Sequence, residues 1–550
     1  MIRRALCLLP AACCLLLLGA QQPKPNDDLC VAPPSGTPPS LPARLLPGQG
    51  RVHLPITTKS QKAQEFFDQG VAQMHSFWAR EAERSFLQAA QLDPDAPMPQ
   101  WGIAMVAAGD YRPGFQLLDD DGKIKKPSLP KPATGQSGLE RALEAAAKAQ
   151  QLASHGDRRE QLYIAAVAAR RNLDSKDPYT DYIQALREIV REFPEEIEAK
   201  SYLALALMSG YSIPDKKPRP GTEEAVALLQ DMLKQPLDHT GIHHYVIHAL
   251  EGSTHPQDAW ASSARYPQLA PEIPHALHMP GHIYVQSDRW TDAASAFDQA
   301  ARKEREQMAA DQLYGNGHHG HNVHFLATTY CFLGKYQDAM AASEELLHIR
   351  ETPREAKQSA NIRTAYRQGW FARMRTLVYF RKWDEILEGS ALPDYPRPRE
   401  RAWRHWVRGL AYAAKGDATR ARAELKSMEE EMKSWRKESG SDSPHLQTAR
   451  AELAGHIELR SGHVAKGLDA LERAARMEIA LRYNEPPAYP RPVWEAMGQA
   501  ALETRQWARA ESAFRHALEQ NPGSPGAKEG LAAARSRSKN PVLASAPGAK

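Results

Sequence analysis

The sequence predicts an all-α protein, a right-handed α-solenoid built from helix hairpins. Two observations support this fold class. Ala, Leu, Glu, Arg and Gln dominate most of the chain with helical periodicity, and alternating strand-like runs are missing. Small and aromatic residues also recur at one fixed set of spacings in distant parts of the chain. Because a repeat array adds hairpins to one continuous core, 550 residues need not form several separate domains.

The N-terminus predicts export. Arg3 and Arg4 precede an apolar run that ends at Leu18, and a polar stretch begins after Ala20. This order is typical of a Sec-type signal peptide, here residues 1–20, and predicts a periplasmic or secreted protein. Anchoring as a lipoprotein, through a cysteine of the apolar run, is the less favoured alternative. No later stretch is apolar over the length that a membrane-spanning helix needs.

Composition divides the rest of the chain into helical and loop-like stretches. The predicted segments are a Pro-rich linker (21–58), an N-terminal helical lobe (59–210), a His-rich segment (223–350), a C-terminal lobe (351–535) and a flexible tail (536–550). Two insertions rich in Pro, Gly, Asp and Lys, about 110–136 and 211–222, are predicted to be loops. The concave inner face of such an array is the expected place for a ligand.

Charge and cysteine content argue against two other classes of protein. The chain has 70 basic and 66 acidic residues, and the basic ones are dispersed, so no nucleic-acid partner is predicted. Once the signal peptide is removed, Cys30 and Cys331 remain. Two cysteines cannot form a disulfide scaffold, so the predicted stability comes from helix packing.

Two well-matched units define the repeat. Small or aromatic residues stand at spacings of 12, 4, 3 and 5 in both units, which are Gly70, Ala82, Phe86, Ala89 and Pro94, and Gly498, Ala510, Phe514, Ala517 and Pro522. This pattern resembles the tetratricopeptide repeat. Small residues let the two helices of a hairpin approach closely, the aromatic residue fills their contact, and the proline ends the second helix.

Histidines concentrate on one face of three successive units. Of the chain's 21 histidines, twelve lie within residues 239–324. His244 and His248 are followed 34 residues later by His278 and His282. In the repeat register both pairs occupy positions 5 and 9 of the first helix, which share a face with positions 2 and 12. In tetratricopeptide proteins this face lines the groove.

This arrangement predicts a metal site. Two imidazoles four residues apart can turn their ring nitrogens to one ion, and a neighbouring helix can complete the coordination. The predicted ligands are His244, His248, His278, His282, Glu251, His321 and His324. Imidazole suits zinc, copper and iron alike, so the identity of the divalent metal stays open. Alternatively, the histidines hydrogen-bond a peptide without any metal.

Other side chains are assigned to the groove or to its surroundings. The predicted groove-lining residues are Tyr245, Tyr284, Cys331, Trp403 and Trp406, with core packing as the competing interpretation for the aromatic ones. Surface positions, or positions behind the ligands, are expected for His243, His255, His275, His318 and His319. Structural or solvated positions are expected for His75, His456 and His516. Glu251, His321 and His324 are predicted to be either additional ligands or an acid/base pair, and the catalytic residues stay unassigned.

Three stretches of residues 239–333 read HYVIHALEGSTHP, LHMPGHIYVQSDRWTDA and HNVHFL. They resemble a bacterial family of exported, His-rich tetratricopeptide proteins that has no settled activity. The first unit departs from that family at HSFWAREA, where an Asn-His pair is expected. The resemblance therefore implies a fold and a site but no reaction. One expected function is binding of a protein or peptide partner in the groove, beside a metal site. The alternatives are a copper-, iron- or zinc-dependent oxidoreductase or hydrolase acting there, and a scaffold without metal.

Overall fold

The computed structural model describes residues 42–117, 136–212, 215–310, 317–349, 365–395, 397–481 and 485–539. The elements formed by these residues are helices, and they contain no β-strand beyond an isolated bridge between Tyr211 and Pro218. The all-α prediction is confirmed. The predicted signal peptide, the linker before residue 42 and the end of the predicted tail lie outside the described residues, as do residues 118–135 of the first predicted insertion.

The N-terminal part contains α1 (Gln61–His75), α2 (Ala79–Leu92), α3 (Met98–Val106), α4 (Gly114–Leu117), α5 (Gly138–Leu152), η1 (Ala153–His155), α6 (Arg158–Arg170), α7 (Pro178–Glu192), α8 (Ile197–Leu207) and α9 (Thr222–Leu233). The His-rich part contains α10 (Thr240–Leu250), η2 (Pro256–Ala259), α11 (Trp260–Leu269), α12 (Pro274–Gln286), α13 (Trp290–Ala310), α14 (Gly317–Phe332) and α15 (Tyr336–His348).

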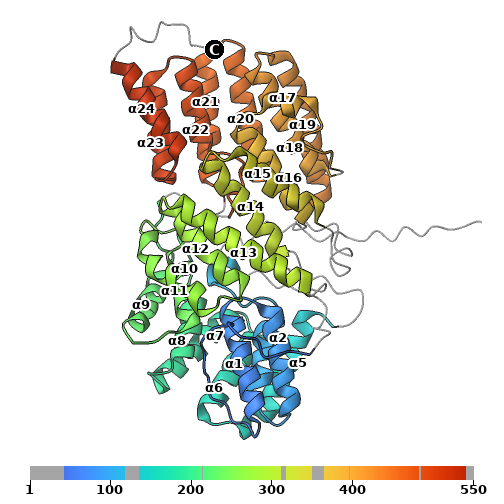
Figure 1. Cartoon of the computed structure of the whole chain (residues 1–550), viewed down its shortest axis with the longest axis vertical. Coiled ribbons are helices and arrows are strands. Elements are labelled where there is room, and N and C mark those ends of the chain that lie inside the picture. Colours follow the sequence, from blue (N-terminus) through green and yellow to red (C-terminus); the bar gives the residue numbers. More distant parts are fainter. Residues whose placement is uncertain are drawn as a thin grey trace, which may run out of the picture.

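The C-terminal part contains α16 (Ala365–Tyr379), α17 (Trp383–Glu388), α18 (Pro398–Ala414), α19 (Ala418–Ser439), α20 (Pro444–Arg460), α21 (Val464–Ile479), α22 (Val493–Glu503), α23 (Trp507–Gln520) and α24 (Pro525–Lys539). Consecutive helices pack as hairpins, and the hairpins stack from α1 at the bottom of Figure 1 to α24 at the top. This arrangement confirms the predicted solenoid of helix hairpins.

Small residues allow the close helix contacts that the repeat pattern predicts. A Cβ atom added to Gly70 would lie 2.6 Å from the ring of Phe86, and one added to Gly498 would lie 2.7 Å from the ring of Phe514. Each of these glycines precedes its aromatic partner by 16 residues, across one hairpin. A larger side chain would therefore have to displace a fully buried ring.

The hairpin turns share a backbone feature. In six hairpins the residue five positions before the small residue of the second helix has a positive φ angle; these residues are Phe77, Asp288, Gly334, Gly416, Gly462 and Arg505. Phe77, at φ 53°, is the bulkiest of them, and non-glycine residues adopt this conformation at a cost. Its ring lies over the histidines described below.

The described end of the predicted linker is fixed to the helices. Residues 42–58 form no helix, but their backbone amides donate to side chains of distant elements. The amide of Thr57 donates to Glu160 of α6 at 2.8 Å, and that of Arg51 donates to the hydroxyl of Thr240 in α10 at 2.8 Å. This segment therefore ties the first helices to the His-rich part.

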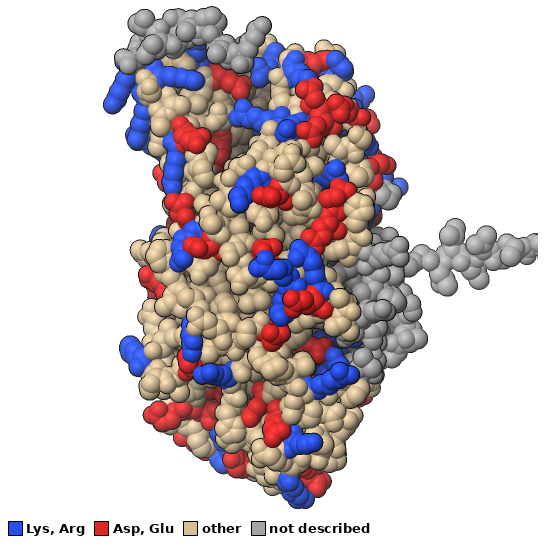
Figure 2. All heavy atoms as spheres, in the orientation of Figure 1, with Lys and Arg blue, Asp and Glu red and all other residues tan. Residues whose placement is uncertain are grey.

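The surface charge and the length of the helices are relevant to possible partners. Lys and Arg side chains are intermixed with Asp and Glu on the face drawn in Figure 2. Among the described helices, none combines the length and the apolar content required to cross a membrane.

A cavity of about 700 Å³ lies at the C-terminal ends of α10, α12, α14 and α16, with the loop before α22 on its far side.

Candidate metal centre

Three helices bring the predicted histidines together. His244 and His248 lie on α10, His278 and His282 on α12, and His321 and His324 on α14. All six side chains are buried, with residue exposures between 0% and 3%. The sequence placed this face in an open groove, whereas the end of α1 and the ring of Phe77 in the turn after it cover the histidines of α10 and His275. The histidines therefore form an internal cluster beside the cavity rather than its lining.

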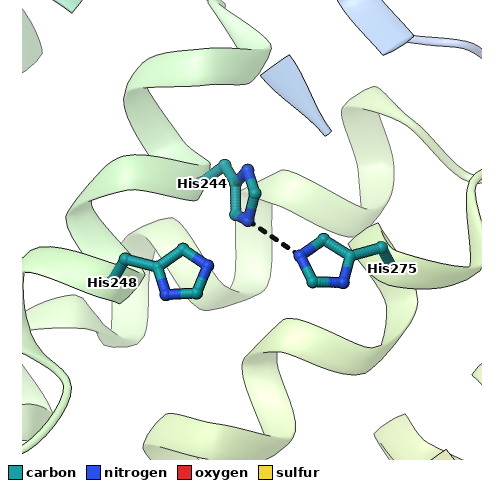
Figure 3. A group of neighbouring side chains, drawn as sticks. All are labelled: His244, His248 and His275. Atoms are coloured by element: carbon teal, nitrogen blue, oxygen red, sulfur yellow. Dashed lines mark hydrogen bonds between the residues drawn. The ribbon is translucent and has the colours of Figure 1, made fainter. Parts of the chain in front are cut away.

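A first triad is formed by His244, His248 and His275. One ring nitrogen from each lies within 4.8 Å of the other two. Figure 3 shows the three rings around a common space, with Nε2 of His244 and Nε2 of His275 facing each other at 3.1 Å. Three imidazoles around one point form a common donor set for zinc, copper and iron.

Hydrogen bonds fix which nitrogens of His244 and His248 carry protons. Nδ1 of His244 lies 2.5 Å from the carbonyl oxygen of His75, so it must donate. Nδ1 of His248 donates to the carboxylate of Glu251 at 3.0 Å. In a neutral imidazole one nitrogen carries the proton, so Nε2 of neutral His244 presents a lone pair to the centre, and Nε2 of His248 faces the same space.

His275 is joined to Glu304 through His318. Glu304 accepts from Nδ1 of His318. Nε2 of His318 lies 3.2 Å from Nδ1 of His275, at hydrogen-bond distance. Nε2 of His275 and Nε2 of His244 lie 3.1 Å apart, a contact that requires a proton or a cation between the two nitrogens.

The donor geometry fits a metal ion. With metal–nitrogen distances of about 2.0–2.1 Å, two nitrogens of a tetrahedral site lie about 3.3 Å apart, close to the separation of His244 and His275. Nε2 of His248 is buried and has no hydrogen-bond partner among the described residues. Buried polar atoms rarely lack partners, so this nitrogen independently points to a ligand in the same space.

A second triad is formed by His278, His282 and His321. Nε2 of His278 lies 2.7 Å from Nε2 of His282 and 3.2 Å from Nε2 of His321. Nδ1 of His278 donates to Oδ1 of Asn322 at 2.7 Å, because the amide nitrogen of Asn322 is committed to donating to Glu304 and to a backbone carbonyl. This bond again leaves the inner nitrogen of His278 as an acceptor.

Two carboxylates hold His282. Its Nδ1 donates to Glu251 at 2.8 Å and forms an ion pair with Glu485, in the loop before α22, at 2.5 Å. Burial alone would lower the pKa of His282, but the charges of Glu485 and Glu251 outweigh it and raise this pKa to about 10. Without a metal, His282 is therefore protonated, and its Nε2 donates to His278. This proton satisfies the contact between His278 and His282.

Four other imidazoles of the two triads are neutral. Burial, with a contribution from neighbouring histidines, holds the pKa of His244, His275, His278 and His321 well below the usual range. Because these rings are neutral at pH 7, a cation that binds them does not have to compete with a second proton on each ring.

Phe77 closes the first triad from the side of α1. Its ring centroid lies 4.5 Å from that of His244, 5.4 Å from that of His248 and 5.7 Å from that of His275. The positive φ angle of the turn points this ring at the histidines. An apolar lid of this kind excludes water and strengthens the electrostatic interactions beneath it.

Other predicted site residues lie elsewhere. His324 donates to Gln368 at 2.7 Å and takes no part in either triad. Tyr245, Trp403 and Trp406 are buried in the core, and Tyr284 packs against Arg289. Cys331 lines the cavity. Glu251 holds His248 and His282 from behind, and its oxygens also form a group with His282 and Glu485.

His75 belongs to a third group, with Glu198 and His239. Both imidazoles donate to Glu198, at 2.6 and 2.7 Å. The other nitrogen of His75 lies 2.7 Å from the hydroxyl of Tyr245, and that of His239 accepts from a backbone amide. Because all four ring nitrogens have protein partners, we interpret this group as structural, in agreement with the expectation for His75.

Sequence reasoning missed four supporting residues. His275 was expected behind the ligands, although it occupies position 2 of its unit, as His321 does in the next, and that register could have identified it. Asn322 and Glu304 lie on α14 and α13 and orient the imidazoles by hydrogen bonds that no spacing reveals. Glu485 reaches the centre from about 200 residues away.

Neither a protein-family model nor a curated protein sequence matches the chain. Similar solved structures include the Cut9–Hcn1 assembly of the APC/C, at 13% sequence identity over 86% of this chain and 76% of that chain, with a TM-score of 0.31. A tetratricopeptide repeat protein from Parabacteroides merdae is 13% identical over 62% of this chain and 97% of its own, with a TM-score of 0.32. Yeast Tom70 is 14% identical over 88% of this chain and 92% of its own, with a TM-score of 0.28. The hairpins and their Gly–Phe packing give the chain the tetratricopeptide-repeat fold.

Proposed function

We propose that this protein binds a divalent transition-metal ion in the triad of His244, His248 and His275, with a second ion accepted by the triad of His278, His282 and His321. The observation that carries the proposal is the convergence of three ring nitrogens within 4.8 Å of one another, two of them 3.1 Å apart, with Nε2 of His248 buried and unpartnered among the described residues. Zinc, copper and iron all suit this donor set.

The supporting residues strengthen the proposal. Imidazole ligands of metal ions usually donate their second nitrogen to a carboxylate or a carbonyl. His244 has a carbonyl behind it and His248 has Glu251. Peptide recognition by exposed groove histidines would require open ring nitrogens, whereas these side chains are buried.

Metal content tests the proposal. The mature protein without a His-tag is dialysed against zinc and, separately, cobalt, and bound metal is measured by elemental analysis and by cobalt absorption. We expect one or two equivalents in the native protein. His248→Ala removes one ligand of the first triad and should weaken metal binding there about 100-fold. Loss of a group that only orients a ligand already lowers metal affinity about 10- to 100-fold.

The matched control is His445→Ala, which removes another buried histidine outside both triads. It should leave metal content unchanged. A native protein that takes up no metal on reconstitution, or a His248→Ala variant that binds as the native protein does, contradicts the proposal.

A second candidate function is a metal-dependent oxidoreductase or hydrolase. The observation that favours it is the cavity, since Glu251 and Glu485 line it while also holding His282. The function expected from the sequence, binding of a protein or peptide partner beside the metal, would use the same cavity. Azide added to the cobalt form separates them: a changed absorption spectrum indicates an open coordination position of the kind catalysis needs.

We also propose that the protein is exported. The support is the order of Arg3, Arg4, the apolar run and Ala20 at the N-terminus. The mature N-terminus, determined by mass spectrometry after bacterial expression, should begin at residue 21. A chain that retains residues 1–20 and stays in the cytoplasm contradicts this part.

A further inference from the structure

The cavity wall contains a buried arginine that forms no ion pair with a carboxylate of the described residues. Arg375 lies on α16, is 5% exposed and lines the cavity. Its Nη atoms donate to three backbone carbonyls of the loop before α22, including those of Tyr489 at 3.1 Å and Pro490 at 3.2 Å. Its Nε has no hydrogen-bond partner among the described residues. The guanidinium therefore retains donor capacity.

Neighbouring arginines are paired, and Arg375 is not. Arg367, two turns earlier on α16, donates to Glu400 at 2.8 Å, and Arg491 lies 2.7 Å from Glu452. Within the described residues no carboxylate oxygen lies within 4.0 Å of a nitrogen of Arg375. A buried charge without a counter-ion is unfavourable, so the site is poised for an anion.

The protonation state of an acidic residue in the same wall adds to this charge balance. Glu478 lines the same cavity, and enclosure, assisted by the charges of Glu452 and Glu495, raises its pKa to about 8. At neutral pH its carboxyl group is mostly protonated. It therefore leaves the charge of Arg375 in place and offers a second hydrogen-bond donor.

The rest of the wall is largely apolar. Val285, Trp290, Phe325 and Phe332 contribute to a cavity of about 700 Å³, within the usual size range of small-molecule sites. The carboxylates of Glu251 and Glu485 stand in the same wall. Their charges disfavour a dianion such as a phosphate monoester, because a second negative charge would be repelled.

We propose that this cavity binds a small organic acid, a single carboxylate on an apolar body, with the carboxylate at Arg375 and the body along Phe325 and Phe332. A guanidinium matches a carboxylate in shape and charge, and such bonds are among the strongest in proteins. The proposal does not depend on the metal centre.

The test compares two probes of equal length on the full-length mature protein. Octanoate and 1-octanol are titrated by calorimetry, in the presence and absence of a chelator. We expect octanoate to bind at least about tenfold more tightly than octanol, as a charge-assisted hydrogen bond contributes. Equal affinities, or inorganic phosphate binding as well as octanoate, would overturn the proposal.

Two variants assign the preference to Arg375. Arg375→Met should lose the octanoate preference while octanol still binds, whereas Arg219→Gln, an exposed arginine of the same cavity, should behave as the native protein does. If Arg375→Met binds neither probe, the loop before α22 that Arg375 holds has lost its conformation. The variant Arg375→Lys, which keeps the positive charge, then tests the proposal. A lysine variant that keeps the octanoate preference supports the proposal, and one without it overturns the proposal.

Discussion

Each imidazole of the first triad is held through its Nδ1, so the metal binding that we propose involves the partners behind the histidines as well. Glu251 is the most connected of these acceptors. Its two oxygens accept from His248 at 3.0 Å and from His282 at 2.8 Å, so one side chain orients one histidine of each triad. A change at Glu251 should therefore affect both sites.

The first prediction concerns Glu251→Gln. The amide keeps the shape of the side chain but retains a single acceptor oxygen, so one of the two histidines loses its partner. We expect metal affinity to fall about 10- to 100-fold, measured by competition with a chromophoric chelator. Glu272→Gln, which alters a half-buried carboxylate of the same part of the chain that lies outside both triads, should leave metal affinity unchanged. Equal affinities of the native protein and Glu251→Gln would show that Glu251 does not support the ligands.

The second prediction concerns pH. The pKa of Glu478 is raised to about 8 from its usual 4.5. Between these values the unfolded chain loses its proton and the folded protein keeps it, so this group destabilises the fold as pH rises, by at most about 1.4 kcal/mol per pH unit. Below pH 4.5 both states are protonated and the effect vanishes.

Glu478→Gln removes this dependence. The free energy of unfolding of this variant minus that of the native protein, both measured with urea, should increase as the pH rises from 5 to 8. Glu472→Gln, on the same helix α21, serves as the control and should show no such gain. A constant difference between Glu478→Gln and the native protein across this range would contradict the shifted pKa.

At the residue scale the sequence predicted most of the imidazoles but not their partners. His244, His248, His278 and His282 follow from one repeat interval, and His321 from the next. The proton-accepting groups depend on contacts across helices, for example the carbonyl of His75 on Nδ1 of His244. A backbone carbonyl has no sequence signal.

At the scale of single elements, the repeat pattern predicted hairpin packing because the relevant contacts are local. Gly498 and Phe514 are 16 residues apart and meet within one hairpin, α22 with α23. The same pattern could not predict how the turn before α2 would be used. There Phe77 takes the place that Gly334 fills in a later hairpin, and its ring covers the first triad.

The third prediction tests this packing. Gly498→Ala places a methyl group 2.7 Å from the buried ring of Phe514 and should destabilise the protein by about 1–3 kcal/mol in chemical denaturation. Adding Phe514→Leu makes room, so the double variant should recover part of this loss relative to the sum of the two single changes. Strict additivity would show that the two residues do not share a contact.

At the scale of the whole molecule, contacts distant in sequence decide where the site lies. The amide of Gln286 donates to Glu485 at 3.0 Å, the indole of Trp290 donates to the carbonyl of Gly523 at 3.0 Å, and Lys528 lies 2.6 Å from Asp288. These pairs join the end of α12 and the start of α13 to the C-terminal hairpins (Figure 1). They close the cavity beside the metal centre. The repeat register carries no information about them, so the sequence predicted an open groove where the chain folds over its own histidines.

The most direct test of the metal centre is anomalous diffraction at the zinc absorption edge from crystals of the mature protein grown with zinc. We predict a peak about 2.0–2.1 Å from Nε2 of His244, His248 and His275, lost in His248→Ala. A peak among the carboxylates of Glu251 and Glu485 with none in the first triad, or no bound zinc at all, would contradict the assignment of this triad as the primary metal site.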